Sequence, residues 1–169
     1  EDILSRDNDV DRLHWLIARQ HNIVSRDVNL ARKMGITTEK VVNYFLISRI
    51  IERIGDHAVR IAKNILNFID EKIDEKIIDT IETASNLALE IFDKSIESFA
   101  ERDINSANRN IDSLTKLVPL CEKINTLALQ QKAAIAVSIG YIAESIRRTG
   151  EYATDISECV INHLINEKT

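Results

Sequence analysis

Residues that interrupt helices are scarce in this chain, which has one proline and four glycines among its 169 residues. Turns between β-strands depend on these two residue types, so the composition argues against a sheet protein with many tight turns. Isoleucine, leucine, alanine, glutamate, lysine and asparagine recur throughout, and long helices are readily built from such a mixture. The hydrophobic content of 44% is ample for a folded core. We therefore expect an all-α protein.

Three other features are missing from the sequence. The two cysteines, Cys121 and Cys159, do not form a Cys-x-x-Cys pair, so neither a zinc site nor a disulfide framework is indicated, and both are expected to be reduced. The 22 basic and 27 acidic residues are mixed along the chain, and no basic block suits direct nucleic-acid binding. No apolar run approaches the roughly 20 residues that cross a bilayer. These absences favour a cytoplasmic protein without membrane insertion, and no direct nucleic-acid binding by this segment.

Apolar residues recur at spacings of three and four, which is the period of an amphipathic helix. The pattern predicts long helices at about 2–34, 38–69, 74–100, 103–130 and 132–166. Gly35 should end the first, Thr37 or Thr38 should cap the second, and Pro119 should interrupt or bend the fourth. The charged junction at 70–76 could continue as helix. Helices of about 30 residues are roughly 45 Å long, so the expected architecture is an elongated antiparallel bundle of five long helices.

An internal repeat relates two parts of the chain. Residues 52–58, Glu-Arg-Ile-Gly-Asp-His-Ala, match residues 147–153, Arg-Arg-Thr-Gly-Glu-Tyr-Ala, with arginine, glycine, an acidic residue and alanine in register. Upstream, residues 7–13 match residues 108–114 more weakly. The repeated unit is therefore a helix hairpin, with the third helix lying between its two copies.

The segment at 52–58, followed by Ile-Ala-Lys-Asn-Ile at 61–65, resembles the PhoU family. Members of that family are built as two three-helix bundles, each with Glu/Asp-x-x-x-Asp motifs on two neighbouring helices. The resemblance covers residues 1–169 and implies a first repeat at about 1–70 and a second at about 74–167. Five helices stand where the family has six, so the first helix of the first bundle is expected to be missing. Either the segment is truncated, or a neighbouring molecule or an upstream domain fills the gap.

Two pairs of carboxylates in the first repeat have the spacing of that motif. Asp7 with Asp11, and Glu52 with Asp56, are four residues apart and so share a helix face. If the two helices are neighbours, the four carboxylates converge on the bundle surface, where oxygen ligands suit iron, manganese, magnesium or calcium. His14 is the nearest additional ligand and extends the range to zinc or iron. The alternative is an acidic surface that serves only solubility.

The second repeat departs from the motif. It has Asn108-x-x-x-Asp112 on one helix and Arg147-x-x-x-Glu151 on the other, and we expect Arg147 to pair with Glu151 or Asp112 rather than leave a cation site. Gly55 and Gly150 occupy equivalent helix positions, where glycine costs roughly 1 kcal/mol relative to alanine. Close approach of another helix is the simplest reason for both.

No phosphate-binding loop, nucleophilic triad or Glu-x-x-His di-iron motif occurs, so an enzyme is not expected. The resemblance implies a regulator of phosphate uptake that contacts phosphate transporter components and a sensor kinase, as a homodimer or larger oligomer. From the ligand chemistry, the expected metal is iron or zinc, with manganese, magnesium or calcium as alternatives. Two alternatives stay open. One is a sensing or oligomerisation domain of a transcriptional regulator with a DNA-binding part upstream. The other is a helical scaffold without metal. We interpret His57 as a structural residue.

Overall fold

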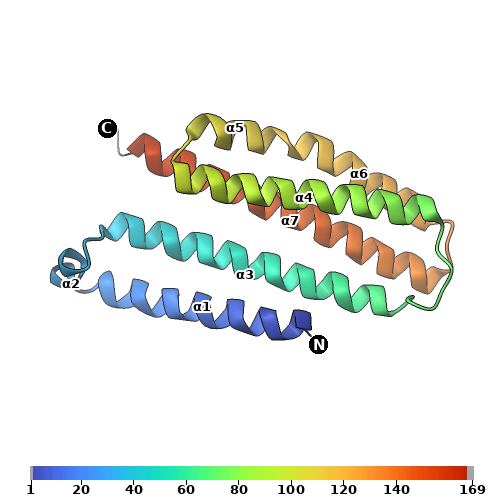
Figure 1. The fold of residues 1–169 in the computed structure, drawn as a ribbon, viewed down its shortest axis with the longest axis horizontal. Coiled ribbons are helices and arrows are strands. Elements are labelled where there is room, and N and C mark those ends of the chain that lie inside the picture. Colours follow the sequence, from blue (N-terminus) through green and yellow to red (C-terminus); the bar gives the residue numbers. More distant parts are fainter. Residues whose placement is uncertain (1, 167–169) are drawn as a thin grey trace.

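The structure, a computed structural model, describes residues 2–166, and this part of the chain is helical without a strand (Figure 1). The helices are α1 (Asp2–Val24), α2 (Val28–Lys33), α3 (Thr38–Leu66), α4 (Glu75–Glu101), α5 (Ile104–Asp112), α6 (Leu114–Ala128) and α7 (Ala133–Asn166). The long helices lie side by side as an elongated bundle. The all-α, antiparallel architecture expected from the hydrophobic period is confirmed.

Capping side chains begin the helices where the sequence predicts. Thr37 Oγ1 accepts a hydrogen bond from the Lys40 amide at 3.2 Å, which fixes the start of α3. Asp74 caps α4 through the Lys76 amide at 2.9 Å, and Asp103 caps α5 in the same way. Each cap satisfies backbone donors that the first helical turn leaves unpaired.

Three expected features of the helices are wrong. The first helix does not reach residue 34, because the chain turns after Val24 and Asp27 caps the separate helix α2. Residues 67–74 form turns and irregular chain instead of a continuous helix. The fourth helix breaks at Ser113, where the amide bonds to Asn110 O at 3.0 Å in a tighter turn, and not at Pro119. Pro119 is exposed on α6, so its ring meets solvent while the helix continues.

Helix α7 lies at the centre of the molecule and packs against α3, α4, α5 and α6. Its apolar stripe is buried along most of its length and meets the apolar faces of α4 and α6 in one core. The α7 residues in this stripe are Ile135, Ile139, Ile142, Ala143, Ile146, Ala153, Ile156, Val160 and Leu164. Helices α4 to α7 therefore form one complete three-helix bundle, in which α5 and α6 together take the place of one helix.

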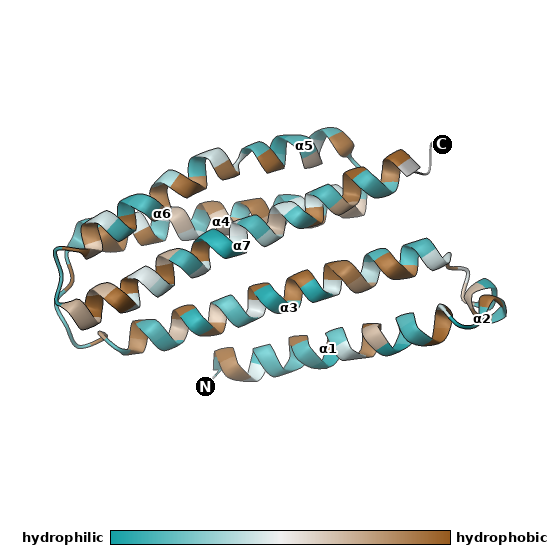
Figure 2. Ribbon diagram, turned by 180° about the vertical axis from the view of Figure 1, so that it is seen from behind, coloured by the Kyte–Doolittle hydropathy of each residue, from teal (hydrophilic) through white to brown (hydrophobic). Residues whose placement is uncertain are grey.

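Helices α1 and α3 form a hairpin that joins this bundle through α3. The two ends of α3 meet opposite ends of α7, because Asn67 Nδ2 donates to Ser138 Oγ at 3.1 Å and Glu39 contacts His163 at 3.2 Å. Helices α3 and α7 are therefore antiparallel. Helix α1 packs against α3 and, more lightly, α2. Apolar residues on its open side stay exposed, and Figure 2 shows them interspersed with polar ones along α1.

Gly150 allows α6 to lie close against α7. A Cβ atom at this position would lie 2.2 Å from Leu117 Cδ2, and Leu117 is fully buried. The expected reason for this glycine, close contact with another helix, is confirmed. None of the described helices has the length and apolarity needed to span a membrane.

Candidate functional site

The four carboxylates of the first repeat influence one another across the α1–α3 hairpin. Burial raises the pKa of Glu52 above its usual range, and Asp56 raises it further. His14 lowers that pKa, while Asp11 of α1 raises it. The pKa of Asp7 is also raised, by burial first and then by Asp11 and Asp56. Carboxylates of α1 and α3 thus lie near enough to interact, and we call these four side chains the acidic face.

Gly55 allows this close arrangement on α3. A Cβ atom at Gly55 would lie 3.1 Å from Asp7 Oδ1 and 3.9 Å from Val10 Cγ1. An alanine would therefore press on the carboxylate that faces α3. The close approach expected at Gly55 is found, and here the approaching atom belongs to a candidate ligand.

His14 is held in a defined orientation next to the acidic face. Its Nδ1 lies 3.0 Å from Ser48 Oγ, and its ring stacks on Phe45 with centroids 5.8 Å apart. Ser48 Oγ already donates its proton to Phe45 O at 2.8 Å, so it can only accept from His14. Neutral His14 then carries its proton on Nδ1 and a lone pair on Nε2. This is the tautomer that ligates a metal through Nε2.

The acidic face borders a broad surface cavity of about 590 Å³, whose walls include His14, Glu52 and Asp56 together with Arg49 and Arg53. Within residues 2–166, no three histidine, cysteine or carboxylate side chains are placed to hold a metal ion as they stand. A cation would therefore bind only after side chains rotate toward one another. Asp7, Asp11, Glu52, Asp56 and His14 remain predicted ligands.

The equivalent position in the second repeat is occupied by an ion-pair network on α7. Arg147 pairs with Glu151, as expected, and also with Glu144 at 2.8 Å. Arg148 contacts the same two carboxylates at 3.0 Å each. Burial alone raises the pKa of Glu144, but hydrogen bonds from Arg147 and Arg148 lower it overall. Two arginines neutralise two carboxylates, so this copy offers no excess negative charge to a cation.

Sequence reasoning missed the aromatic contacts between α3 and α7. The Arg60 guanidinium lies 4.7 Å from the Tyr141 ring centroid, and Arg53 lies 5.6 Å from that of Tyr152. His57 contacts Tyr152 with centroids 5.7 Å apart, and burial lowers its pKa. This position between two helices agrees with a structural interpretation of His57. The pairs come from helices far apart in sequence, so no local spacing predicts them.

The match to a known protein family covers both repeats. The sequence model described as the PhoU domain matches residues 1–65 and 81–160. A phosphate-specific transport system accessory protein PhoU homolog of Clostridium acetobutylicum is 29% identical over 160 residues, which are 90% of this chain and 67% of that protein. PhoU homolog 1 of Thermotoga maritima is 22% identical over 166 residues, or 94% of this chain and 70% of that protein.

A solved structure has the same fold. It is the crystal structure of the phosphate transport system regulatory protein PhoU from Streptococcus pneumoniae, with a TM-score of 0.70 and 16% sequence identity. The match covers 95% of this chain and 84% of that one. The resemblance inferred from residues 52–65 is confirmed.

Replacing Glu52 by glutamine should stabilise the protein at neutral pH. Folding raises the pKa of Glu52. The charged carboxylate therefore lowers the free energy of unfolding at pH values above its pKa in the folded protein, and this loss disappears below the ordinary pKa of 4.5. Because solvent screens this partly exposed carboxylate, we expect Glu52→Gln to raise the free energy of unfolding by only a few tenths of a kcal/mol near pH 7, with the gain fading below about pH 4. Urea unfolding at both pH values measures this, with Glu97→Gln on the exposed face of α4 as control. A lower free energy of unfolding for Glu52→Gln than for the wild type near pH 7 would contradict repulsion among the carboxylates of the acidic face.

Proposed function

This chain belongs to the PhoU family, and on that premise we propose that it regulates phosphate uptake by contacting components of a phosphate transport system. The observation that carries the proposal is the family match, which extends over both repeats. The curated relatives are named as accessory proteins of phosphate-specific transport. The proposed role is regulatory rather than catalytic, on the cytoplasmic side of the membrane, with a sensor kinase as a further partner and a homodimer as the working unit.

The open side of α1 supports binding to another protein. Leu13 and Trp15 are 61% and 64% exposed, and Ile23 is 54% exposed. Large apolar side chains in a polar surrounding are typical of protein interfaces, and tryptophan is enriched among residues that dominate binding energy. We assign the contact with transport components to this surface, which we call the α1 face.

We also propose that the acidic face binds a cation through Asp7, Asp11, Glu52 and Asp56, with His14 as an additional ligand. Iron or zinc is favoured because of the histidine, and manganese, magnesium or calcium suits the carboxylates. Two features support this: the raised pKa values of Glu52 and Asp7, and the His14 tautomer that Ser48 selects. A cation would relieve the repulsion among these carboxylates.

The regulatory proposal is tested by co-purification of the chain with the transporter components and sensor kinase of the same organism. Trp15→Ser combined with Leu13→Ser should weaken capture at least about tenfold, because truncation removes the two most exposed large apolar side chains of α1. Leu129→Ser is the matched control, since Leu129 is 81% exposed and follows α6, outside the α1–α3 hairpin. Equal capture by the wild type and the double variant would contradict the assignment to α1.

The cation proposal is tested by elemental analysis after reconstitution with each metal. We expect bound metal in the wild type and its loss in the variant with Glu52→Ala and Asp56→Ala. The control variant carries Glu97→Ala and Glu101→Ala, an acidic pair at the same spacing on α4, and should keep its metal. Negligible metal in the wild type would remove the cation from the mechanism and leave protein binding as the function.

A further inference from the structure

The α1–α3 hairpin also carries an apolar groove, which none of the four carboxylates of the acidic face lines. Two cavities lie along it, of about 350 Å³ and about 320 Å³. Ile17 of α1 and Tyr44 and Ile51 of α3 line the first, and Ile3 of α1 and Ile65 of α3 line the second. The stretch of α3 from Tyr44 to Ile65 is about 30 Å long, from the rise per residue of a helix. We call this surface the hairpin groove.

The internal repeat shows what covers the equivalent surface in the second half of the chain. The register that aligns residues 52–58 with 147–153 also pairs positions of the hairpin groove with positions of α7. The pairs are Tyr44 with Ile139, Ile51 with Ile146, and Ala58 with Ala153. The three α7 residues are at most 2% exposed, in a core to which α4 contributes Ala84, Ala88 and Ile91. Helix α4 therefore covers the face of α7 that corresponds to the groove.

In the first repeat, no helix of residues 2–166 takes that covering position. Helix α3 packs chiefly against α1 and α7, whereas α7 has four helical neighbours. Tyr44 is 45% exposed, Ala58 is exposed and Ile51 is half-buried, although their counterparts on α7 are buried. Removing such apolar surface from water is favourable, so a helix placed over the groove is stabilised there.

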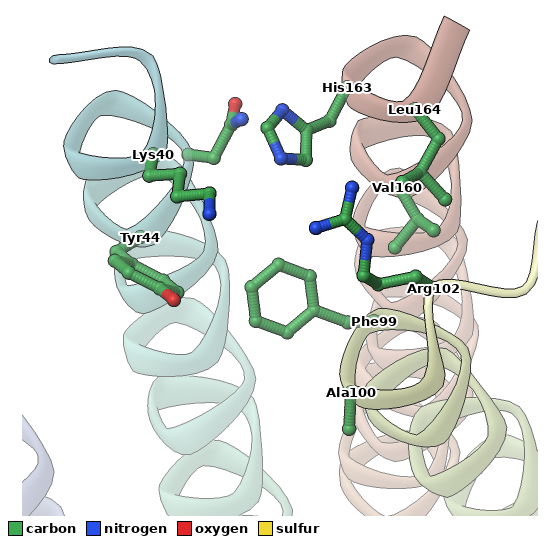
Figure 3. A pocket seen from close by; sticks show the side chains of 9 residues that line it. Lys40, Tyr44, Phe99, Ala100, Arg102, Val160, His163 and Leu164 are labelled. Atoms are coloured by element: carbon green, nitrogen blue, oxygen red, sulfur yellow. The ribbon is translucent and has the colours of Figure 1, made fainter. Parts of the chain in front are cut away.

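The groove ends beside α4. Tyr44 also lines a smaller cavity of about 190 Å³, where the start of α3 meets the ends of α4 and α7 (Figure 3). Lys40, Arg102 and His163 line that smaller cavity as well. The Tyr44 ring meets Phe99 of α4 edge to face, with centroids 5.8 Å apart. This contact holds the Tyr44 ring in place, so this end of the groove is formed before any partner binds.

We infer that the hairpin groove binds an amphipathic helix of a partner protein, as α4 lies on α7. The helix should have at least about 20 residues, to follow the groove from Tyr44 to Ile65. Its apolar stripe should be like that of α4, whose buried residues are mostly small and allow close packing of two helices. Leu13 of the α1 face is one turn from Ile17, so the two surfaces adjoin and one partner can contact both. That this partner is a transport component rests on the proposed function.

The test is fluorescence anisotropy of a labelled peptide with the sequence of α4, residues 75–101, titrated with the chain. We expect saturable binding, at least about tenfold weaker in Ala58→Arg, because a covering apolar helix would bury the new charge. Ala58 is exposed, so this change spares the core. Ala133→Arg, at an exposed alanine in the first turn of α7, is the matched control and should bind as the wild type does. A peptide with Ala84→Glu and Ala88→Glu should not bind.

Absence of saturable binding, or equal affinity of the wild type and Ala58→Arg, would overturn the inference. A dimer of the chain alone that becomes a monomer in Ala58→Arg, measured by light scattering, would overturn the assignment to a partner and make a second copy the occupant. Equal capture of transport components by the wild type and Ala58→Arg would remove the groove from that contact and leave the proposed regulation standing. Absent capture with intact peptide binding would remove the regulation and leave the groove as a helix-binding site.

Discussion

Burial of α7 on several sides is the constraint on which the remaining structure depends. Four other helices pack against it, and a helix surrounded in this way needs small residues where neighbours come close. Gly150 provides one such place for Leu117 of α6. Buried hydroxyls on the same helix bond within it, as Thr149 Oγ1 does to Ser145 O at 3.0 Å. The bundle of α4 to α7 closes around this helix, and α3 is then positioned by the one side of α7 that remains.

The position of α3 determines where the acidic face lies. Toward α1 it presents Glu52 and Asp56, and toward the ends of α4 and α7 it presents Lys40 and Asn43. Acidic and basic chemistry are thus separated onto two sides of a single helix. A cation bound to the acidic face would act on α3, which also carries α1. This arrangement gives the regulatory proposal a physical route from a bound cation to the α1 face.

Much of the fold could be predicted from the sequence because its signals are local. Hydrophobic period located the main helices, and Thr37 was one of the two residues expected to cap the second. The break at Ser113 could not be predicted, because the nearby Asn110 is buried and donates to Ile91 O at 2.8 Å and to Ser157 Oγ at 3.1 Å. Those partners lie on other helices, and they outweigh the local signal of Pro119.

The acidic face was also predictable, since each pair of its carboxylates lies within one turn of one helix. The cavity lined by Lys40, Arg102 and His163 was not, because these residues come from three helices and share no spacing in the sequence. The turn at 25–27 has a signal that could have been used, because Asp27 is a favourable cap for α2. The apolar periodicity continues across this turn, and it favoured one continuous helix over the cap signal of Asp27.

Native-state hydrogen exchange tests the central role of α7 most directly. Helix α7 is packed on several sides and α1 chiefly on one, so the account predicts two levels of protection. Amides in the middle of α7 should exchange only through global unfolding, and those of α1 through smaller openings that cost at least about 2 kcal/mol less. Equal protection of α1 and α7, with the same dependence on urea, would contradict the view that the hairpin is an attachment to a bundle built around α7.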